Sequence, residues 1–270
     1  MSQDVAANPT GCAPGATGRH GVSRRVGHAV RMLLIFFLLP LATHAVWWLA
    51  QDHPRSFSEA NWSSSGVLPP AAQVRDAVVH VLAGRTGRWK GVFAHHTWLV
   101  VKPRGASRYT RFDVVGWGQP VRVDNYPADG RWFGDTPVVL TTLRGEAAER
   151  AIPRIRDAVA AYPYSTAGSY GVWPGPNSNT FIAYIARTVP EIAGGLLPTA
   201  IGKDYSPWPQ FIALTPSGTG VQLSLAGLLG VSVGWIEGVE VNLLGLVAGI
   251  DVRRPALKIP GWGRIGMSAA

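Results

Sequence analysis

Three residues of types that catalyse hydrolysis, His96, Asp113 and Ser178, follow one another along the chain. His96 lies in AHHTWLVV, whose β-branched and aromatic residues are typical of a strand. Asp113 lies in the next such run, RYTRFDVVGW, and a hairpin would bring it beside a histidine near the start of the first. A histidine that takes a proton from a serine hydroxyl, with a carboxylate that orients its ring, is the machinery of acyl transfer.

Ser178 lies where a loop gives way to a helix. The segment WPGPNSNTFIAYIARTVPEI opens with Pro and Gly, and its apolar residues then recur at helical spacing. A hydroxyl at a helix start meets free N–H groups and the positive end of the helix dipole, which would hold an oxyanion. Serine and asparagine are also preferred caps, so Asn177 or Ser178 could serve only to start the helix.

The two adjacent histidines cannot both face one cleft. Neighbouring strand residues point to opposite faces, so His96 shares a face with Trp98 while His95 points the other way. A structural role for His96 is an alternative, and Asp113 could pair with Arg111 or Arg108 instead.

A metal site and cysteine chemistry are not expected. His80, His95, His96 and Asp113 fit no strong metal-binding spacing, and no cofactor motif stands out. The one cysteine, Cys12, precedes the apolar run near the N-terminus, which excludes a disulfide framework and a cysteine nucleophile in the domain that follows.

Four phrases resemble the bacterial family known as domain of unknown function 3750. They are GRWKGVFAHHTWLVVKP, RYTRFDVVGWG, YPYSTAGSYGVWPGPNSNTF and LLPTAIGKDY, within residues 70–215. This resemblance carries no activity with it.

More remotely, the order of parts is similar to the circularly permuted NlpC-like papain fold, which includes the lecithin retinol acyltransferase group. There a histidine opens a strand, a polar partner follows on the next strand, and a cysteine opens a later helix in a phrase such as Asn-Cys-x-x-Phe. The resemblance implies a papain-like α+β core and places His96, Asp113 and Ser178 on these three positions. Because serine stands in the cysteine position, thiol catalysis is impossible. We expect a substrate cleft to be lined by four further residues: Trp98, Trp173, Asn177 and Asn179.

Residues 32–50, MLLIFFLLPLATHAVWWLA, predict a transmembrane anchor. They contain no Asp, Glu, Lys or Arg, and about 20 apolar helical residues cross a bilayer core. Trp47 and Trp48 suit the headgroup region at one end. Arginines, among them Arg19, Arg24 and Arg31, precede the run, which predicts a cytoplasmic tail over residues 1–31 and a single pass through a bacterial inner membrane. A cleaved signal peptide is the alternative, but its apolar core would be shorter, with a small-x-small cleavage site after it.

The remainder reads as a linker and a periplasmic domain with two parts. Residues 51–72 are rich in Ser and Pro, as in a linker. Residues 73–215 would form the papain-like α+β domain with an antiparallel sheet. Within this domain, VRDAVVHVLAG is a helix or a buried strand. A helix is predicted at EAAERAIPRIRDAVAAYP, and it could restart at Pro153. Residues 216–270 form a β-rich extension of hairpins, because VQLSLAGLLGVSVGW alternates with period two and carries several glycines.

Composition excludes one broad class of function. The net charge of +9 in 270 residues is spread singly outside the N-terminal tail, so nucleic-acid binding is not expected. We therefore expect a membrane-anchored cell-envelope protein that cleaves or transfers at an amide or ester bond, with peptidoglycan peptides or lipids as substrates. The alternative is a catalytically inactive relative that binds envelope peptides, lipids or a partner protein. The oligomeric state is not predicted.

Overall fold

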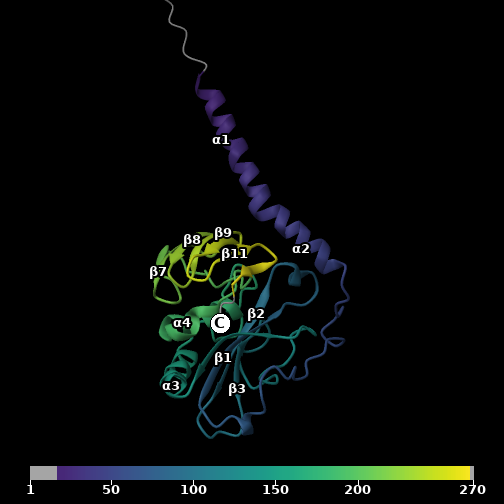
Figure 1. Ribbon diagram of the computed structural model, residues 1–270, viewed down its shortest axis with the longest axis vertical. Helices are drawn as coiled ribbons and strands as arrows, with labels where there is room; N and C mark the ends of the chain where they lie inside the picture. Colours follow the sequence, from purple (N-terminus) through teal and green to yellow (C-terminus); the bar gives the residue numbers. More distant parts are fainter. Residues whose placement is uncertain (1–16, 268–270) are drawn as a thin grey trace, which may run out of the picture.

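The computed structural model describes residues 17–267, and Figure 1 shows a long helix rising from a two-part body. The helix consists of α1 (Thr17–Leu33), a π-helical segment η1 (Leu34–Leu38) and α2 (Leu39–Leu49). Its part Arg24–Leu49 is long and apolar enough to cross a membrane, by length and composition. Pro40, which has no backbone N–H to donate, lies just after the π-helical segment η1 within the continuous helix. Cys12 and the side chain of Arg19 lie outside the described part.

A five-stranded antiparallel sheet forms the first part of the body. Its strands, in the order β4-β3-β2-β1-β5, are β1 (Val78–Arg85), β2 (His95–Lys102), β3 (Thr110–Val114), β4 (Val121–Val123) and β5 (Val138–Arg144). The run that could have been helix or strand is therefore strand β1, which lies between β2 and β5 and is buried on both faces. The mixed helix and antiparallel sheet predicted for this domain is confirmed.

Two helices cover one face of this sheet. They are α3 (Glu146–Ala160) and α4 (Ser178–Thr188), and they pack on the alternate residues of β1 and β2 that include Val79, Leu99 and Val101. Helix α3 runs on through Pro153 without a restart. Three short 3-10 segments connect the elements: η2 (Ala71–Gln73), η3 (Arg88–Val92) and η4 (Pro190–Gly195).

The opposite face is covered by loops, including the segment predicted to be a linker. Within residues 51–72, Trp62 packs against the aromatic rings of Tyr126, Trp132 and Phe133, and Leu68 is buried. The carboxylate of Asp129 accepts hydrogen bonds from residues 64, 66 and 68. The segment does connect the long helix to the sheet, but it is also hydrogen-bonded and packed against the domain.

The second part is a seven-stranded antiparallel meander, which confirms the predicted hairpins. Its strands pair in sequence order: β6 (Ile212–Leu214), β7 (Gly220–Leu225), β8 (Leu229–Gly234), β9 (Gly238–Leu243), β10 (Leu246–Asp251), β11 (Ala256–Ile259) and β12 (Gly263–Gly266). This sheet lies beside the helix in Figure 1. Its polar side chains point inward and its apolar ones outward.

The long helix docks on the body through α2. His44 is fully buried beside the ring of Trp262, whose indole N–H donates to Thr43 Oγ1. Trp48 donates to the backbone oxygen of residue 88 and lies so close to Gly91 that a Cβ there would be 2.1 Å from its ring. The long helix and the domain are therefore packed together over residues 43–48.

Candidate functional site

His96 and Asp113 form a buried pair in the first sheet. His96 Nε2 donates to Asp113 Oδ1 at 2.6 Å, and both side chains are almost completely buried. They share the face of neighbouring strands β2 and β3, which is the hairpin arrangement expected from the spacing. The pair has the geometry of a base and its orienting carboxylate.

Arg111 occupies the other oxygen of the same carboxylate. Its Nη2 and Nε donate to Asp113 Oδ2 at 2.6 and 3.0 Å, so the guanidinium is bidentate on that oxygen. Burial by itself raises the pKa of Asp113, but the charges of His96 and Arg111 and their hydrogen bonds outweigh it and hold that pKa below its usual range. The pairing with Arg111 was one of the alternatives; it lies in the interior and not on the surface.

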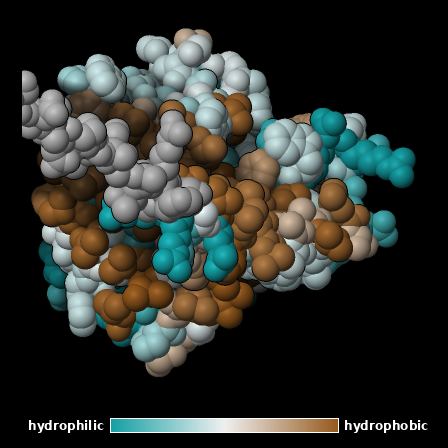
Figure 2. All heavy atoms as spheres, turned by 90° about the horizontal axis from the view of Figure 1, so that it is seen from above, coloured by the Kyte–Doolittle hydropathy of each residue, from teal (hydrophilic) through white to brown (hydrophobic). Residues whose placement is uncertain are grey.

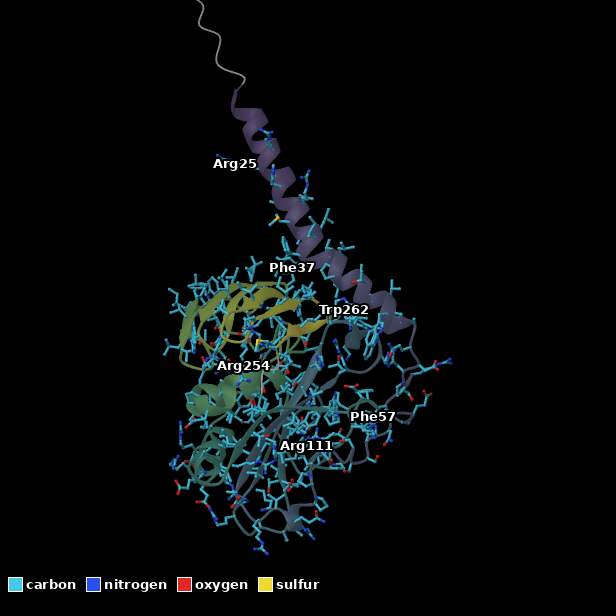
Figure 3. The ribbon with its side chains drawn as sticks, in the orientation of Figure 1. Arg25, Phe37, Phe57, Arg111, Arg254 and Trp262 are labelled. Atoms are coloured by element: carbon cyan, nitrogen blue, oxygen red, sulfur yellow. The ribbon has the colours of Figure 1, made fainter. Side chains whose placement is uncertain are left out.

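Aromatic rings enclose this cluster. The His96 ring lies flat on Trp132, with centroids 3.6 Å apart and planes 6° apart. The Arg111 guanidinium lies 4.1 Å from the ring centroid of Trp98, in cation–π contact. Gly84, which pairs with His96 across the strands, leaves room for Trp132, because a Cβ there would be 2.8 Å from the Trp132 Cβ. The imidazole is thus fixed on the loop-covered face of the sheet. Arg111, on the same face, is labelled in Figure 3.

Ser178 begins α4 on the other face of the sheet. The cap is Asn177, whose side chain accepts from the backbone N–H groups of residues 179 and 180 in a capping box with Thr180. Thr97, the neighbour of His96 in β2, donates to Asn179 Oδ1 at 2.8 Å and lies within 3.4 Å of the Ser178 carbonyl oxygen. Ser178 itself is buried and occupies the first helical position.

The sheet therefore separates two of the three candidate catalytic residues. Thr97 reaches α4, and adjacent strand residues point to opposite faces, so the side chain of His96 points away from that helix. Within residues 24–267, the hydrogen bonds of His96 and the contacts of Ser178 do not join the two. The roles of nucleophile and base stay predictions, while the pair His96–Asp113 is present.

The four residues expected to line a cleft differ in their surroundings. Trp98 is fully buried, with its indole N–H on the carbonyl of residue 128, so it belongs to the core. The amide of Asn179 bonds Thr97 and the carbonyls of residues 95 and 201, and Asn177 caps the helix, so these polar groups are used within the fold. Trp173 alone of the four is exposed, and it donates to the carbonyl of residue 244.

The remaining histidines of the sheet point to separate partners. His95 Nδ1 contacts Thr199 Oγ1 at 2.8 Å, and His80 Nδ1 contacts Thr142 Oγ1 at 2.9 Å. Burial, with the charge of a nearby arginine, lowers the pKa of His80 to about 4 and that of His95 well below the ordinary value. In the described part of the chain, no group of three or more His, Cys, Asp or Glu could hold a metal ion.

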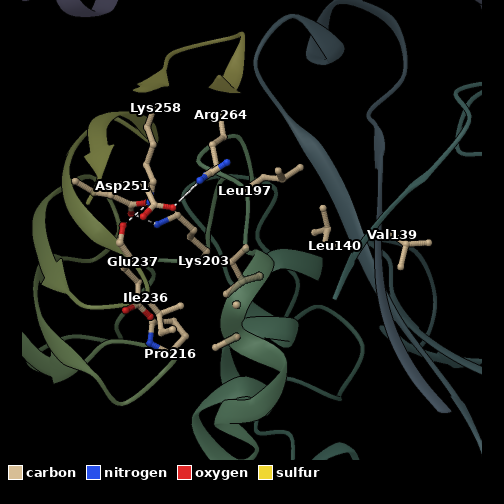
Figure 4. Close-up of a pocket in the computed structure, with 14 residues that line it drawn as sticks. Val139, Leu140, Leu197, Lys203, Pro216, Ile236, Glu237, Asp251, Lys258 and Arg264 are labelled. Atoms are coloured by element: carbon tan, nitrogen blue, oxygen red, sulfur yellow. Dashed lines mark hydrogen bonds and ion pairs between the residues drawn. The ribbon is translucent and has the colours of Figure 1, made fainter. Parts of the chain in front are cut away.

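A second polar cluster lies between the two sheets and lines a cavity (Figure 4). The volume of this cavity is about 160 Å³. Lys203 Nζ donates to Asp204 Oδ1 at 2.8 Å and to Glu240 Oε2 at 2.5 Å, and Lys258 Nζ donates to Glu240 Oε1 at 2.5 Å. Burial lowers the pKa of a lysine, yet the two carboxylates raise the pKa of Lys203 above its usual range. Asp251 and Arg264 pair at 2.9 Å on the same wall.

This interior cluster joins the second sheet to the loop that carries Lys203 and Asp204. The backbone oxygen of Asp204 accepts from Gln222 and Ser224, and its carboxylate accepts from Asn242. Acids and bases in it neutralise one another, so it fastens the second sheet to the LLPTAIGKDY segment and does not present a charge to a ligand. In the sequence, this cluster is indicated only by the polar residues at every second position of the later strands. Such a local pattern does not identify the loop that these residues contact.

Comparison with known proteins identifies the first sheet and its helices. Residues 76–205 match the family described as "Protein of unknown function (DUF3750)". Neither the curated proteins nor the solved structures contain a match to this chain. The match covers β1 through the Lys203–Asp204 segment and confirms the resemblance seen in the sequence. Residues 76–205 are therefore a domain of the DUF3750 family of proteins of unknown function.

Proposed function

We propose that this protein is a single-pass cell-envelope protein whose domain, on the periplasmic side of a bacterial inner membrane, works by binding and not by hydrolysis. The observation that carries the binding function is the separation of His96 from Ser178 by the sheet. A serine hydroxyl is a weak nucleophile without a base that reaches its proton. His96 is instead held by Asp113 and Trp132.

The anchor is supported by the apolar helix Arg24–Leu49 and by the arginines at its N-terminal end. Its packing against the domain through His44 and Trp48 keeps the domain at the membrane. Envelope lipids are the ligand class that this position favours over peptides or a partner protein. The permuted papain-like arrangement remains part of the proposal; it is supported by the order of histidine strand, acidic strand and capped helix.

Hydrolysis with Ser178 as nucleophile is the second candidate, favoured by one observation, the His96–Asp113 hydrogen bond. A fluorophosphonate probe, which reacts with activated serines, separates the two. The full chain in detergent is incubated with the probe beside the Ser178→Ala and His96→Gln variants. We expect no labelling of the wild type. Labelling that disappears in both variants, with their thermal unfolding still cooperative, would establish a serine hydrolase and overturn the binding proposal.

A further inference from the structure

The outer face of the seven-stranded sheet carries apolar residues in continuous rows. One row crosses all seven strands, from Leu214 in β6 through Val221, Val233 and Val239 to Ile265 in β12. A second row runs through Leu223, Val231 and Val241, which are 49%, 41% and 44% exposed. Exposed apolar patches of this extent are rare on proteins surrounded only by water.

The inner face of the same strands is polar. Gln222, Ser224, Ser232, Glu240 and Asn242 alternate with the apolar residues and are all buried. All but Ser232 form hydrogen bonds with Lys203 or Asp204. In a sheet with one face in water the burial is normally the reverse, with apolar residues inside. The polarity of this sheet therefore fits an apolar medium outside it.

The membrane helix lies directly beside this face. Phe37, in η1, is buried and lines an open apolar hollow of about 610 Å³ together with Leu223, Val231 and Val241. Figure 3 places Phe37 between the helix and the sheet, and Figure 2 shows apolar side chains gathered over this face and along the helix. The two apolar surfaces are continuous.

The position of Phe37 along the helix indicates how deep in the membrane the sheet would lie. From Ala50 back to Phe37 the helix rises about 20 Å, and the hydrocarbon core of a bilayer is about 30 Å thick. If residues 32–50 cross that core, a sheet packed on Phe37 lies at the depth of the acyl chains. The helix cannot be inserted to this point while the neighbouring rows stay in water.

Aromatic residues lie at the margin of this face, where a surface inserted to this depth would meet the lipid headgroups. Phe211 lines the hollow and packs edge-to-face with Trp208, which is 73% exposed, and Trp235 is exposed directly after β8. Tryptophan favours the level of the headgroups, where its ring is apolar and its N–H remains wet.

We propose that the outer face of strands β6–β12 is a lipid-binding surface that enters the acyl-chain region of the bilayer beside the anchor helix. The sheet does not cross the bilayer, because its opposite face is closed by the first domain. The proposal rests on the membrane anchor of the proposed function, and it names lipid acyl chains as the ligand of this surface.

Depth-dependent quenching on the full chain tests it. Cys12→Ser removes the native thiol, and single cysteines at Leu223, Leu39 and Val123 are labelled with the environment-sensitive fluorophore NBD. Leu39 is an exposed helix residue, and Val123, 56% exposed in the first sheet, is the matched apolar control away from the rows. Each protein is reconstituted in phosphatidylethanolamine–phosphatidylglycerol vesicles with and without lipids that carry a nitroxide on the acyl chain.

We expect the labels at positions 223 and 39 to show blue-shifted emission and strong quenching by the nitroxide lipids, while the label at position 123 is quenched by aqueous iodide. Quenching at position 39 but not at 223 would overturn the lipid surface and leave the anchor intact. Absence of lipid quenching at both positions would overturn the anchor as well. A label at 223 shielded from iodide but not quenched by lipid would show that a second copy covers the face, which also overturns the proposal.

Discussion

The imidazole of His96 is stacked on the indole of Trp132, with a centroid distance of 3.6 Å, while its Nε2 donates to Asp113. Arg111 takes the other oxygen of the same carboxylate. These contacts make the group an interior ion cluster in which each member compensates the burial of the others.

Asp113→Asn is expected to destabilise the fold strongly. The substitution leaves the Arg111 guanidinium buried without its counter-charge, and breaking a buried pair in this way costs about 3–5 kcal/mol. The measurement is the free energy of unfolding from denaturant titration of the full chain in one detergent. Asp76→Asn is the control, because its pair with Arg104 is exposed to solvent and should contribute little to stability. Equal losses in the two variants would contradict the interior role of the cluster.

Asn177→Ala should cost more stability than Ser178→Ala. Asn177 accepts two backbone N–H groups at the start of α4, and loss of such a cap costs about 1 kcal/mol, whereas Ser178 follows it in the first turn. Thermal unfolding of both variants under identical conditions compares the neighbours directly. A larger loss for Ser178→Ala would mean that its hydroxyl holds the helix start.

Gly91→Ala should loosen the packing of α2 on the domain. A Cβ at this position would lie 2.1 Å from the Trp48 ring and 2.6 Å from the Thr86 carbonyl oxygen, so the helix has to shift. We expect about 1–3 kcal/mol of lost stability, as for other overpacked sites. Gly194→Ala is the control, since nothing lies within 4 Å of its added Cβ. If the control loses as much stability as Gly91→Ala, the helix is not packed here.

His80 makes stability depend on pH. Its folded pKa is lowered to about 4, from an ordinary value of 6.5, by burial first and the charge of Arg144 second. Its contribution is therefore complete above pH 6.5 and is lost as the pH falls toward 4, by on the order of 3 kcal/mol. His80→Gln should flatten the fall of the unfolding temperature over this range. Thr142→Val, which removes only the hydrogen-bond partner, should keep the slope. An unchanged slope in His80→Gln would assign the effect to other groups.

The pairing of His96 with Asp113 could be predicted because strand alternation and a short hairpin are local properties of the sequence. Two other features of the site depend on tertiary packing. Trp132 reaches His96 from a loop between β4 and β5, and the position of Ser178 depends on which face of the sheet α4 covers. No spacing along the chain encodes either choice.

In the C-terminal extension, too, the sequence predicts the strands but not how they pack. Period-two alternation in residues 221–243 predicts strands, and strands are present. Alternation does not state which set of residues is buried. Here the polar set is inside because the charged Lys203–Asp204 segment lies against it, some twenty residues earlier in sequence than Ser224.

The inverted polarity of the second sheet also bears on how the protein is made. The strands of residues 212–266 leave the ribosome after the helix and the first domain, since synthesis runs from the N-terminus. Folded alone, they would have a polar interior without its counter-charges and an apolar exterior in water, a surface prone to aggregation. Their assembly therefore requires the finished Lys203–Asp204 segment as a template, and because this segment precedes them in the chain, it is synthesised before the last strands arrive.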